Sequence, residues 1–350
     1  MKIQDITLIR ALRHHNYRLF FYGQSISLIG TWIQQIALSW LVYRLTNSAL
    51  LLGIVGFSGQ ISTFFLAPLA GVIADRHHRH RLLLITQSVA MIQAFILAIL
   101  VMTHRIEIWQ IIALNVLLGA INAFDIPIRQ SFTSDMISNH DDMSNAIALN
   151  SSMVNAARLL GPAIGGFLIA AVGEGMCFLL NALSYIAVIS SLLLMRVPKR
   201  ELRVRKSNVW EELKEGFDYT FGFMPIRTFL SLVGLVSMTG GGMQVLMPVF
   251  AQDIFHGGAR TLGLLMGSSG LGALIGAVYL ANRKSVLGLS KVIIVASFSF
   301  GCGLIGFVLA PSLWLSLIML VFCGFGMIVQ MSASNVILQS MVEEDKRGRV

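Results

Sequence analysis

Charge is scarce in this chain, since only 12% of its 350 residues are Asp, Glu, Lys or Arg and 55% are hydrophobic. A soluble domain usually carries about 25% charged residues. Cysteine is rare too: Cys177, Cys302 and Cys323 lie within apolar stretches, with no metal-ligand spacing and no obvious pairing. We therefore expect no metal site and no cofactor, with the cysteines acting as small apolar side chains in helix packing.

Signatures of catalysis are missing as well. No Gly-rich loop ending in Lys-Ser/Thr is present, so nothing indicates ATP hydrolysis. The closely spaced His77, His78 and His80 are flanked by arginines, which favours a solvated basic loop over a metal site. We expect a protein that is not an enzyme.

What the chain does contain is a series of ten apolar stretches, each near the roughly 20 residues that a helix needs to cross a bilayer. They lie near residues 20–43, 50–73, 82–102, 109–125, 147–172, 178–195, 229–250, 262–281, 292–309 and 313–341. The 32 glycines fit close packing of membrane helices. The sequence therefore predicts an all-α polytopic membrane protein.

The net charge of +9 follows the alternation of these stretches. Of 26 Lys and Arg residues, 20 fall in the N-terminus, every second connection and the tail, whereas the opposite connections hold only Arg44, Arg105 and Arg260. The positive-inside rule then predicts a cytoplasmic N-terminus, and the basic surplus does not indicate a nucleic-acid partner. Residues 1–18 are polar and basic, so we expect the first helix, not a cleavable signal, to direct insertion.

The longest polar break divides the chain into a six-helix half (1–196), a cytoplasmic linker (197–225) and a four-helix half (226–350). Apolar residues at i+4 spacing predict an amphipathic surface helix in the linker. These are Val209, Leu213, Phe217 and Phe221.

A weak internal repeat links the two halves. Val-Gly-Phe-Ser-Gly at 55–59 matches Met-Gly-Ser-Ser-Gly at 266–270, and an Arg-containing connection follows each. Repeats related by an axis along the membrane normal are typical of transporters. If the second half matches the first, two further spans follow Val350; a natural ten-helix protein is the alternative.

The second apolar stretch ends in Gly71, Asp75 and Arg76, and Arg79 follows. This segment resembles the loop signature of the major facilitator superfamily, Gly-x-x-x-Asp-Arg-x-Gly-Arg-Arg, with His78 in place of its second glycine. The resemblance implies a gate in which Asp75 pairs with a basic side chain across the interface between the halves. The basic cluster would hold the loop against the anionic leaflet.

The fifth apolar stretch contains a motif that resembles the antiporter signature of the same family, with Ala157 in place of its first glycine. Its residues are Gly161, Pro162, Gly165 and Gly166. A proline removes a helix hydrogen bond and glycines permit close packing, so we expect a bendable helix. In the family this motif is associated with exporters.

Further strings, at 124–131, 145–151, 177–185 and 347–350, are similar to the subgroup of the enterobactin exporter and related secretion and drug exporters. The resemblance implies a major-facilitator fold of two six-helix halves in the bacterial cytoplasmic membrane. It implies a monomer that exports small amphipathic molecules, drugs or siderophores, by proton antiport and alternating access. A non-transporting receptor or a truncated remnant is the alternative.

Charged residues inside membrane spans are costly and usually functional. Asn115 stands where many proton-coupled relatives have an arginine, so the candidates for proton coupling are Asp125, Arg129 and Arg158. Asp125 and Arg129 have the i, i+4 spacing of a local ion pair, which is the alternative, structural interpretation.

Gln34, Gln35 and Gln244 are the candidates for the substrate cavity, because the first and seventh spans hold equivalent places in the two halves. Hydrogen bonding between helices is the alternative role for each of them.

Overall fold

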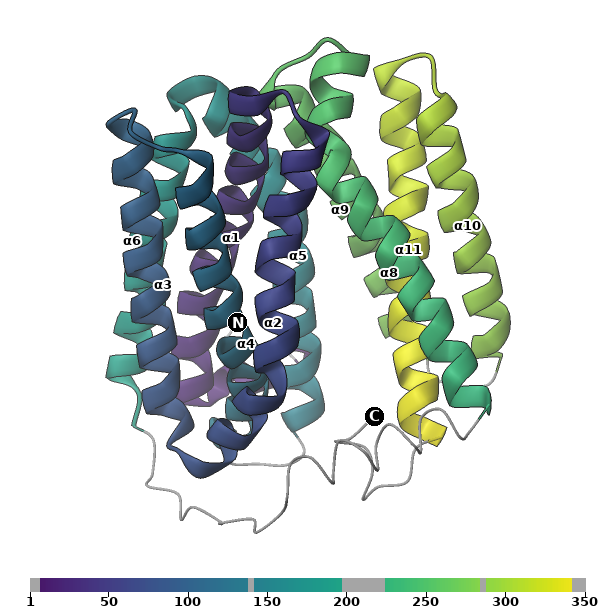
Figure 1. The fold of residues 1–350 in the computed structure, drawn as a ribbon. Coiled ribbons are helices and arrows are strands. Elements are labelled where there is room, and N and C mark those ends of the chain that lie inside the picture. Colours follow the sequence, from purple (N-terminus) through teal and green to yellow (C-terminus); the bar gives the residue numbers. More distant parts are fainter. Residues whose placement is uncertain (1–6, 138–141, 197–223, 284–287, 342–350) are drawn as a thin grey trace. The chain divides into compact units, whose positions relative to one another are not determined.

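The computed structural model describes residues 7–137, 142–196, 224–283 and 288–341, and within these ranges it is entirely helical (Figure 1). Ten helices are long and apolar enough to cross a membrane, which confirms the predicted all-α membrane architecture. They are α1 (His15–Thr46), α2 (Ala49–Arg76), α3 (Arg79–Met102), α4 (Ile108–Asp135), α5 (Met143–Val172), α6 (Glu174–Leu194), α8 (Met224–Val249), α9 (Ala259–Ala281), α10 (Leu289–Leu309) and α11 (Leu313–Met341). Two short elements, the 3₁₀ helix η2 (Thr7–Arg13) and the π-helical turn η4 (Phe250–Ile254), accompany them. The predicted amphipathic helix of the linker lies outside the described residues.

Several helices extend beyond the apolar stretches that predicted them, among them α2 and α4. α4 continues past Asp125 and through Pro127 to Asp135, and α2 continues to Arg76. Hydrophobicity ends a predicted span at the first charge, but the helix itself needs only backbone hydrogen bonds, and membrane helices tolerate an internal proline. Asp125 therefore lies in the body of α4 and not at its end, where the sequence predicted it.

The chain forms two compact units. The N-terminal unit consists of Met1–Arg205 together with Pro248–Gly263, and the C-terminal unit of Lys206–Met247 together with Leu264–Val350. The segment Pro248–Gly263 comprises the end of α8, the turn η4 and the start of α9, and it packs with the N-terminal unit. The division predicted from the sequence placed this segment in the C-terminal half.

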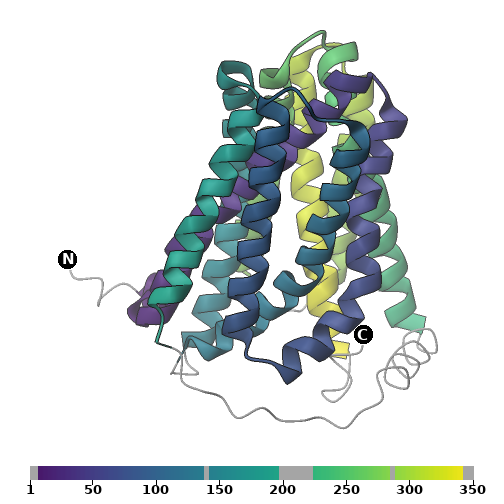
Figure 2. The ribbon, with the colours of Figure 1, turned by 60° about the vertical axis from the view of Figure 1, so that its left-hand side comes forward.

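In the N-terminal unit α6 packs against α1 and α3, while α4 packs against α2 and α3 (Figures 1 and 2). Large apolar side chains such as Tyr17, Phe20 and Phe132 are completely or almost completely buried in its core. By contrast, Ile85, Ile92 and Ile99 recur every seven residues on α3 and are exposed. Such a stripe of exposed isoleucines suits contact with lipid chains.

In each unit, one of the close helix contacts at a glycine involves the predicted repeat. A Cβ atom at Gly119 of α4 would collide with the carbonyl oxygen of Gly59 in α2, and one at Gly324 of α11 would collide with that of Ser269 in α9. Gly59 and Ser269 belong to the two copies of the predicted repeat, so the repeated sequence occupies the same kind of contact in both units. The Thr63 hydroxyl adds a hydrogen bond of 2.9 Å to the Gly119 carbonyl oxygen.

We predict that Gly119→Ala lowers the thermal stability of the purified protein. The new methyl group meets main chain, which cannot rotate away, and overpacking typically costs about 1–3 kcal/mol. The matched control is Gly53→Ala, because a Cβ at Gly53 of α2 meets nothing within 4 Å. Thermal unfolding in detergent measures both variants, and equal melting temperatures would contradict the proposed close contact.

Candidate functional site

A buried carboxylate stands in the interior of the N-terminal unit. Asp125 is only 6% exposed. Its Oδ1 accepts hydrogen bonds from the Thr86 hydroxyl at 2.9 Å and from Gln87 Nε2 at 2.7 Å, both on α3. Its Oδ2 lies 3.5 Å from Nε of Arg129, one turn further along α4. The two charged residues that the sequence singled out are thus brought together, and α3 supplies two neutral donors.

Among the described residues, Tyr185 of α6 is a further titratable group, and it lies within electrostatic range of Asp125 and Arg129. Gln87 is itself 5% exposed, and its Oε1 has no hydrogen-bond partner among the described residues. Charges in a membrane interior are normally paired and often functional, so this cluster is the strongest candidate for a functional site.

Sequence reasoning missed Thr86 and Gln87. A signal was available, because they form a polar pair near the start of the apolar stretch 82–102. Their contact with Asp125, however, depends on the rotation of α3 about its axis, and no pattern in one sequence reports that rotation.

Of the proposed cavity residues, Gln34 is buried in a network of polar side chains. Its Nε2 donates to Gln93 Oε1 at 3.3 Å, and its Oε1 accepts from Asn181 Nδ2 at 2.8 Å. Gln34, Gln93 and Asn181 come from α1, α3 and α6, and none is more than 2% exposed. Gln34 therefore makes hydrogen bonds between helices, as in the alternative interpretation, and its place in a substrate cavity stays a prediction. Gln35 is exposed, and Gln244 of α8 is half-buried.

Arg158 of α5, the third coupling candidate, does not join the Asp125 cluster. Its guanidinium lies over the ring of Trp32 in α1, 5.4 Å from the ring centre. Its Nε is buried and has no hydrogen-bond partner among the described residues. A cation stacked on an aromatic face is partly stabilised by the ring, and this places Arg158 at the contact between α5 and α1.

The glycines of the antiporter-like motif let α5 approach α1 closely. A Cβ at Gly161 would collide with Trp32, and one at Gly165 with Ile36. A Cβ at Gly166 would lie 2.5 Å from the Cα of Gly263, in the segment that joins the N-terminal unit from beyond α8. These glycines, with Pro162 between them, let α5 approach α1 on one side and the start of α9 on the other.

The loop signature is described only in part. Gly71, Asp75 and Arg76 lie in the last turns of α2, but their side chains lie outside the described residues. The Arg79 guanidinium donates to the Ser131 carbonyl oxygen at 3.1 Å and lies 3.4 Å from the Asp135 carboxylate. Arg79 thus ties the start of α3 to the end of α4.

A second polar cluster lies at the far end of α1. The Tyr43 hydroxyl donates to the Asp253 carboxylate, and Gln252 Nε2 donates to Asn47 Oδ1 at 3.2 Å. We call Tyr43, Asn47, Gln252 and Asp253 the clasp. Gln252 and Asp253 belong to the π-helical turn η4, a geometry that is frequent at functional sites. Nearby, Arg44 pairs with Glu174 at 2.7 Å and holds α1 to the start of α6.

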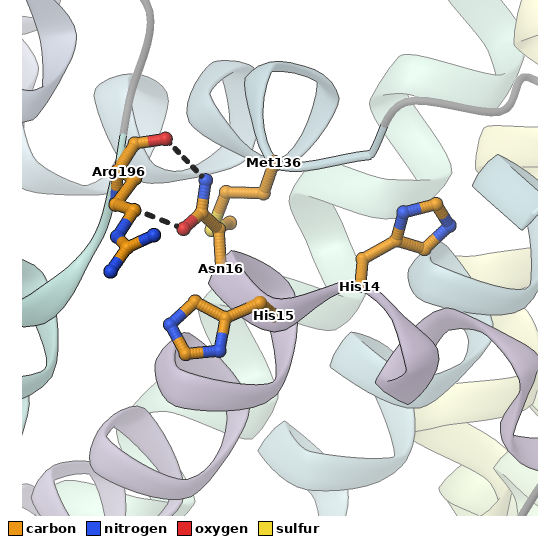
Figure 3. Close-up of a pocket in the computed structure, with 5 residues that line it drawn as sticks. All are labelled: His14, His15, Asn16, Met136 and Arg196. Carbon is orange, nitrogen blue, oxygen red and sulfur yellow. Dashed lines mark hydrogen bonds between the residues drawn. The ribbon is translucent and has the colours of Figure 1, made fainter.

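A surface pocket of about 400 Å³ lies at the opposite end of the unit, where α1 begins (Figure 3). It is lined by His14, His15, Asn16, Met136 and Arg196. The Asn16 side chain exchanges two hydrogen bonds with the main chain of Arg196, at 2.9 and 3.1 Å, and His14 points away toward Asp142, 3.1 Å from its Nε2. These contacts join the start of α1 to the start of α5 and the end of α6, and the pocket contains no residue of the Asp125 cluster.

Comparison with known proteins agrees with this architecture. A family model described as transmembrane secretion effector, MFS_3, matches residues 6–350. The staphyloferrin A transporter of Staphylococcus aureus is 29% identical, with 95% of this chain and 83% of that protein covered. The enterobactin exporter EntS of Salmonella paratyphi A is 22% identical, with 96% and 80% covered. Among solved structures, the nucleoside transporter NupG has a similar fold, with a TM-score of 0.67 at 16% identity over 98% of this chain and 85% of that one.

We predict that Gln34→Leu destabilises the protein by about 1–3 kcal/mol, because Gln93 Oε1 and Asn181 Nδ2 each lose a buried partner. The matched control is Gln35→Leu, the same change at the exposed neighbouring residue, which should alter stability by less than about 0.5 kcal/mol. Thermal unfolding in detergent measures both. Equal losses would show that the buried network does not stabilise the unit.

Proposed function

Because the chain belongs to the transmembrane secretion effector family, within the major facilitator superfamily, we propose that it is a proton-driven exporter of small amphipathic molecules that works by alternating access. That the chain is a multi-pass membrane transporter and not an enzyme follows from the family and its relatives. The proposal consists of the driving proton gradient, the direction of transport and the substrate class. It also includes the location of the protein in the bacterial cytoplasmic membrane with a cytoplasmic N-terminus, and its action as a monomer.

The observation that carries proton coupling is the burial of Asp125 within a membrane span. A proton-driven carrier needs a group that binds a proton in one conformation and releases it in another. Asp125 is a carboxylate in a low-dielectric interior, balanced by one cation, Arg129, and by neutral donors. Protonation of Asp125 would leave Arg129 without its counter-charge, so gain or loss of one proton changes the local electrostatics strongly.

The substrate class is supported by the relatives and by the exporter-associated motif. Two of the relatives are named for siderophores, staphyloferrin A and enterobactin. The glycines Gly161, Gly165 and Gly166 retain the spacing of the antiporter signature and make close contacts in this fold. We therefore place the substrate in the siderophore or drug class.

Alternating access is supported by the place of the clasp in the chain. Gln252 and Asp253 directly follow α8, a helix of the C-terminal unit, yet they bind α1 of the N-terminal unit. A movement of α8 relative to the N-terminal unit must therefore strain or open the clasp. We assign the clasp as the outer gate and the loop signature, with Asp75, Arg76 and Arg79, as part of the inner gate.

We predict that Asp125→Asn abolishes proton-coupled export, because an amide side chain neither takes up nor releases a proton in this pH range. Purified protein in liposomes is tested with staphyloferrin A, enterobactin and ethidium, and substrate-driven proton movement is recorded with a pH-sensitive dye. Asp142→Asn is the control, since Asp142 pairs with His14 at the end of the unit, outside the Asp125 cluster and outside both proposed gates. Proton movement retained in Asp125→Asn would contradict the coupling role, and absence of any flux through the wild-type protein would favour a non-transporting receptor.

We also predict that Tyr43→Phe loosens the clasp, because it removes only the hydroxyl that binds Asp253. Hydrogen–deuterium exchange of residues 248–258 should then become faster by about tenfold, since a hydrogen bond to a charged group is worth about 1.5–3 kcal/mol. Tyr22→Phe is the control, because Tyr22 lies on the same helix and is exposed. Unchanged exchange in Tyr43→Phe would show that the hydroxyl does not hold the segment.

A further inference from the structure

The Thr86 hydroxyl has two acceptors within reach. Its oxygen lies 2.9 Å from Asp125 Oδ1 and 3.1 Å from the carbonyl oxygen of Leu83, one turn earlier on α3. A hydroxyl carries one hydrogen, so it can donate to only one of the two at a time, and its oxygen can accept a bond as well. Thr86 can therefore donate to Asp125, or donate to Leu83 and accept from Asp125.

Gln87 also has more hydrogen-bonding capacity than it uses. Its Nε2 donates to Asp125 Oδ1 at 2.7 Å, whereas its Oε1 is buried and has no partner among the described residues. An unsatisfied buried acceptor lowers the stability of the folded protein. Rotation of the side-chain amide would present this oxygen, in place of the nitrogen, to Asp125.

We propose that Thr86 and Gln87 are positioning residues that accommodate Asp125 in both its ionised and its protonated form. The inference rests on the proposed coupling role of Asp125 and adds the residues that make proton exchange feasible in a dry interior. In the ionised form both residues donate to the carboxylate. In the protonated form the new O–H bond on Asp125 donates to Thr86, whose hydrogen turns to Leu83, or to the amide oxygen of Gln87. The proton arrives from water during loading and returns to water on release.

The other groups around Asp125 cannot make this adjustment. Arg129 has only donors and therefore favours the ionised form alone. Tyr185 lies within electrostatic range of Asp125, and among the described residues the structure shows no hydrogen bond between the two. A carboxylate needs only donors, so the ionised form uses neither the alternative bond from Thr86 to Leu83 nor the oxygen of Gln87. Both match the extra hydrogen of the protonated acid.

The test is infrared spectroscopy of the full-length protein in liposomes across a pH titration. A protonated carboxylic acid has a distinct C=O stretching band, and Asp125→Asn identifies which band belongs to Asp125. Thr86→Val and Gln87→Met keep the side-chain size and remove the polar groups. Thr86→Ser retains the hydroxyl, and Ser88→Ala removes a hydroxyl of α3 that donates to Leu84 and does not contact Asp125.

We expect two changes in Thr86→Val and in Gln87→Met. The pH at half-protonation should rise by about half to one unit, since a hydrogen bond to the charged form is stronger than one to the neutral form. The band should also move to higher wavenumber, because the protonated acid loses a partner. Thr86→Ser and Ser88→Ala should match the wild-type protein in both measurements, and Thr86→Ser should match it in the pH dependence of ethidium transport.

Three other outcomes separate a failure of this inference from a failure of the proposed function. If the midpoint shifts but the band does not, the two residues bind only the carboxylate, and their role in the protonated form is refuted. If neither changes, the inference fails while the role of Asp125 stands. If Asp125→Asn retains proton-coupled transport, the proposed function itself fails, whatever the spectra show.

Discussion

The interior of a bilayer offers no water to polar groups, so each one buried there must find its partner within the bundle. This constraint decides how four helices of the N-terminal unit face one another. Asp125 of α4 requires the donors of α3, and Gln34 of α1 requires Gln93 of α3 and Asn181 of α6. Rotation of any of these helices would leave a buried polar atom without a partner. The polar contacts therefore specify orientation more than they add stability.

Helix association in lipid depends on close packing, because apolar side chains contact lipid chains as favourably as they contact another helix. Gly119 against Gly59, and Gly166 against Gly263, bring main chains into direct contact. Such contacts are short-ranged and contain no interlocked large side chains. They hold helices together without locking large side chains, which suits the proposed alternating access.

The sequence predicted the membrane helices well and the hydrogen-bond partners of their side chains poorly. Ten helices followed from the length of the apolar stretches, and Asp125 and Arg129 stood out because charge interrupts such stretches. Thr86 did not, because its contact with Asp125 joins residues 39 positions apart and depends on helix rotation. Gln34 and Gln35 show the limit clearly: consecutive residues on a helix point about 100° apart, and the same residue type is buried at one position and exposed at the next.

A proton at Asp125 and the clasp at the far end of α1 must influence each other if the proposed cycle is correct. Within the N-terminal unit, α3 touches both Asp125 and, through Gln93, the Gln34 side chain of α1. The same α1 helix then continues without interruption to Tyr43. Coupling over such a distance requires elements with two discrete arrangements, not merely a chain of contacts. In the proposed cycle, the Thr86 hydroxyl with its two acceptors and the clasp with a bonded and an open arrangement would be two such elements, joined by this route.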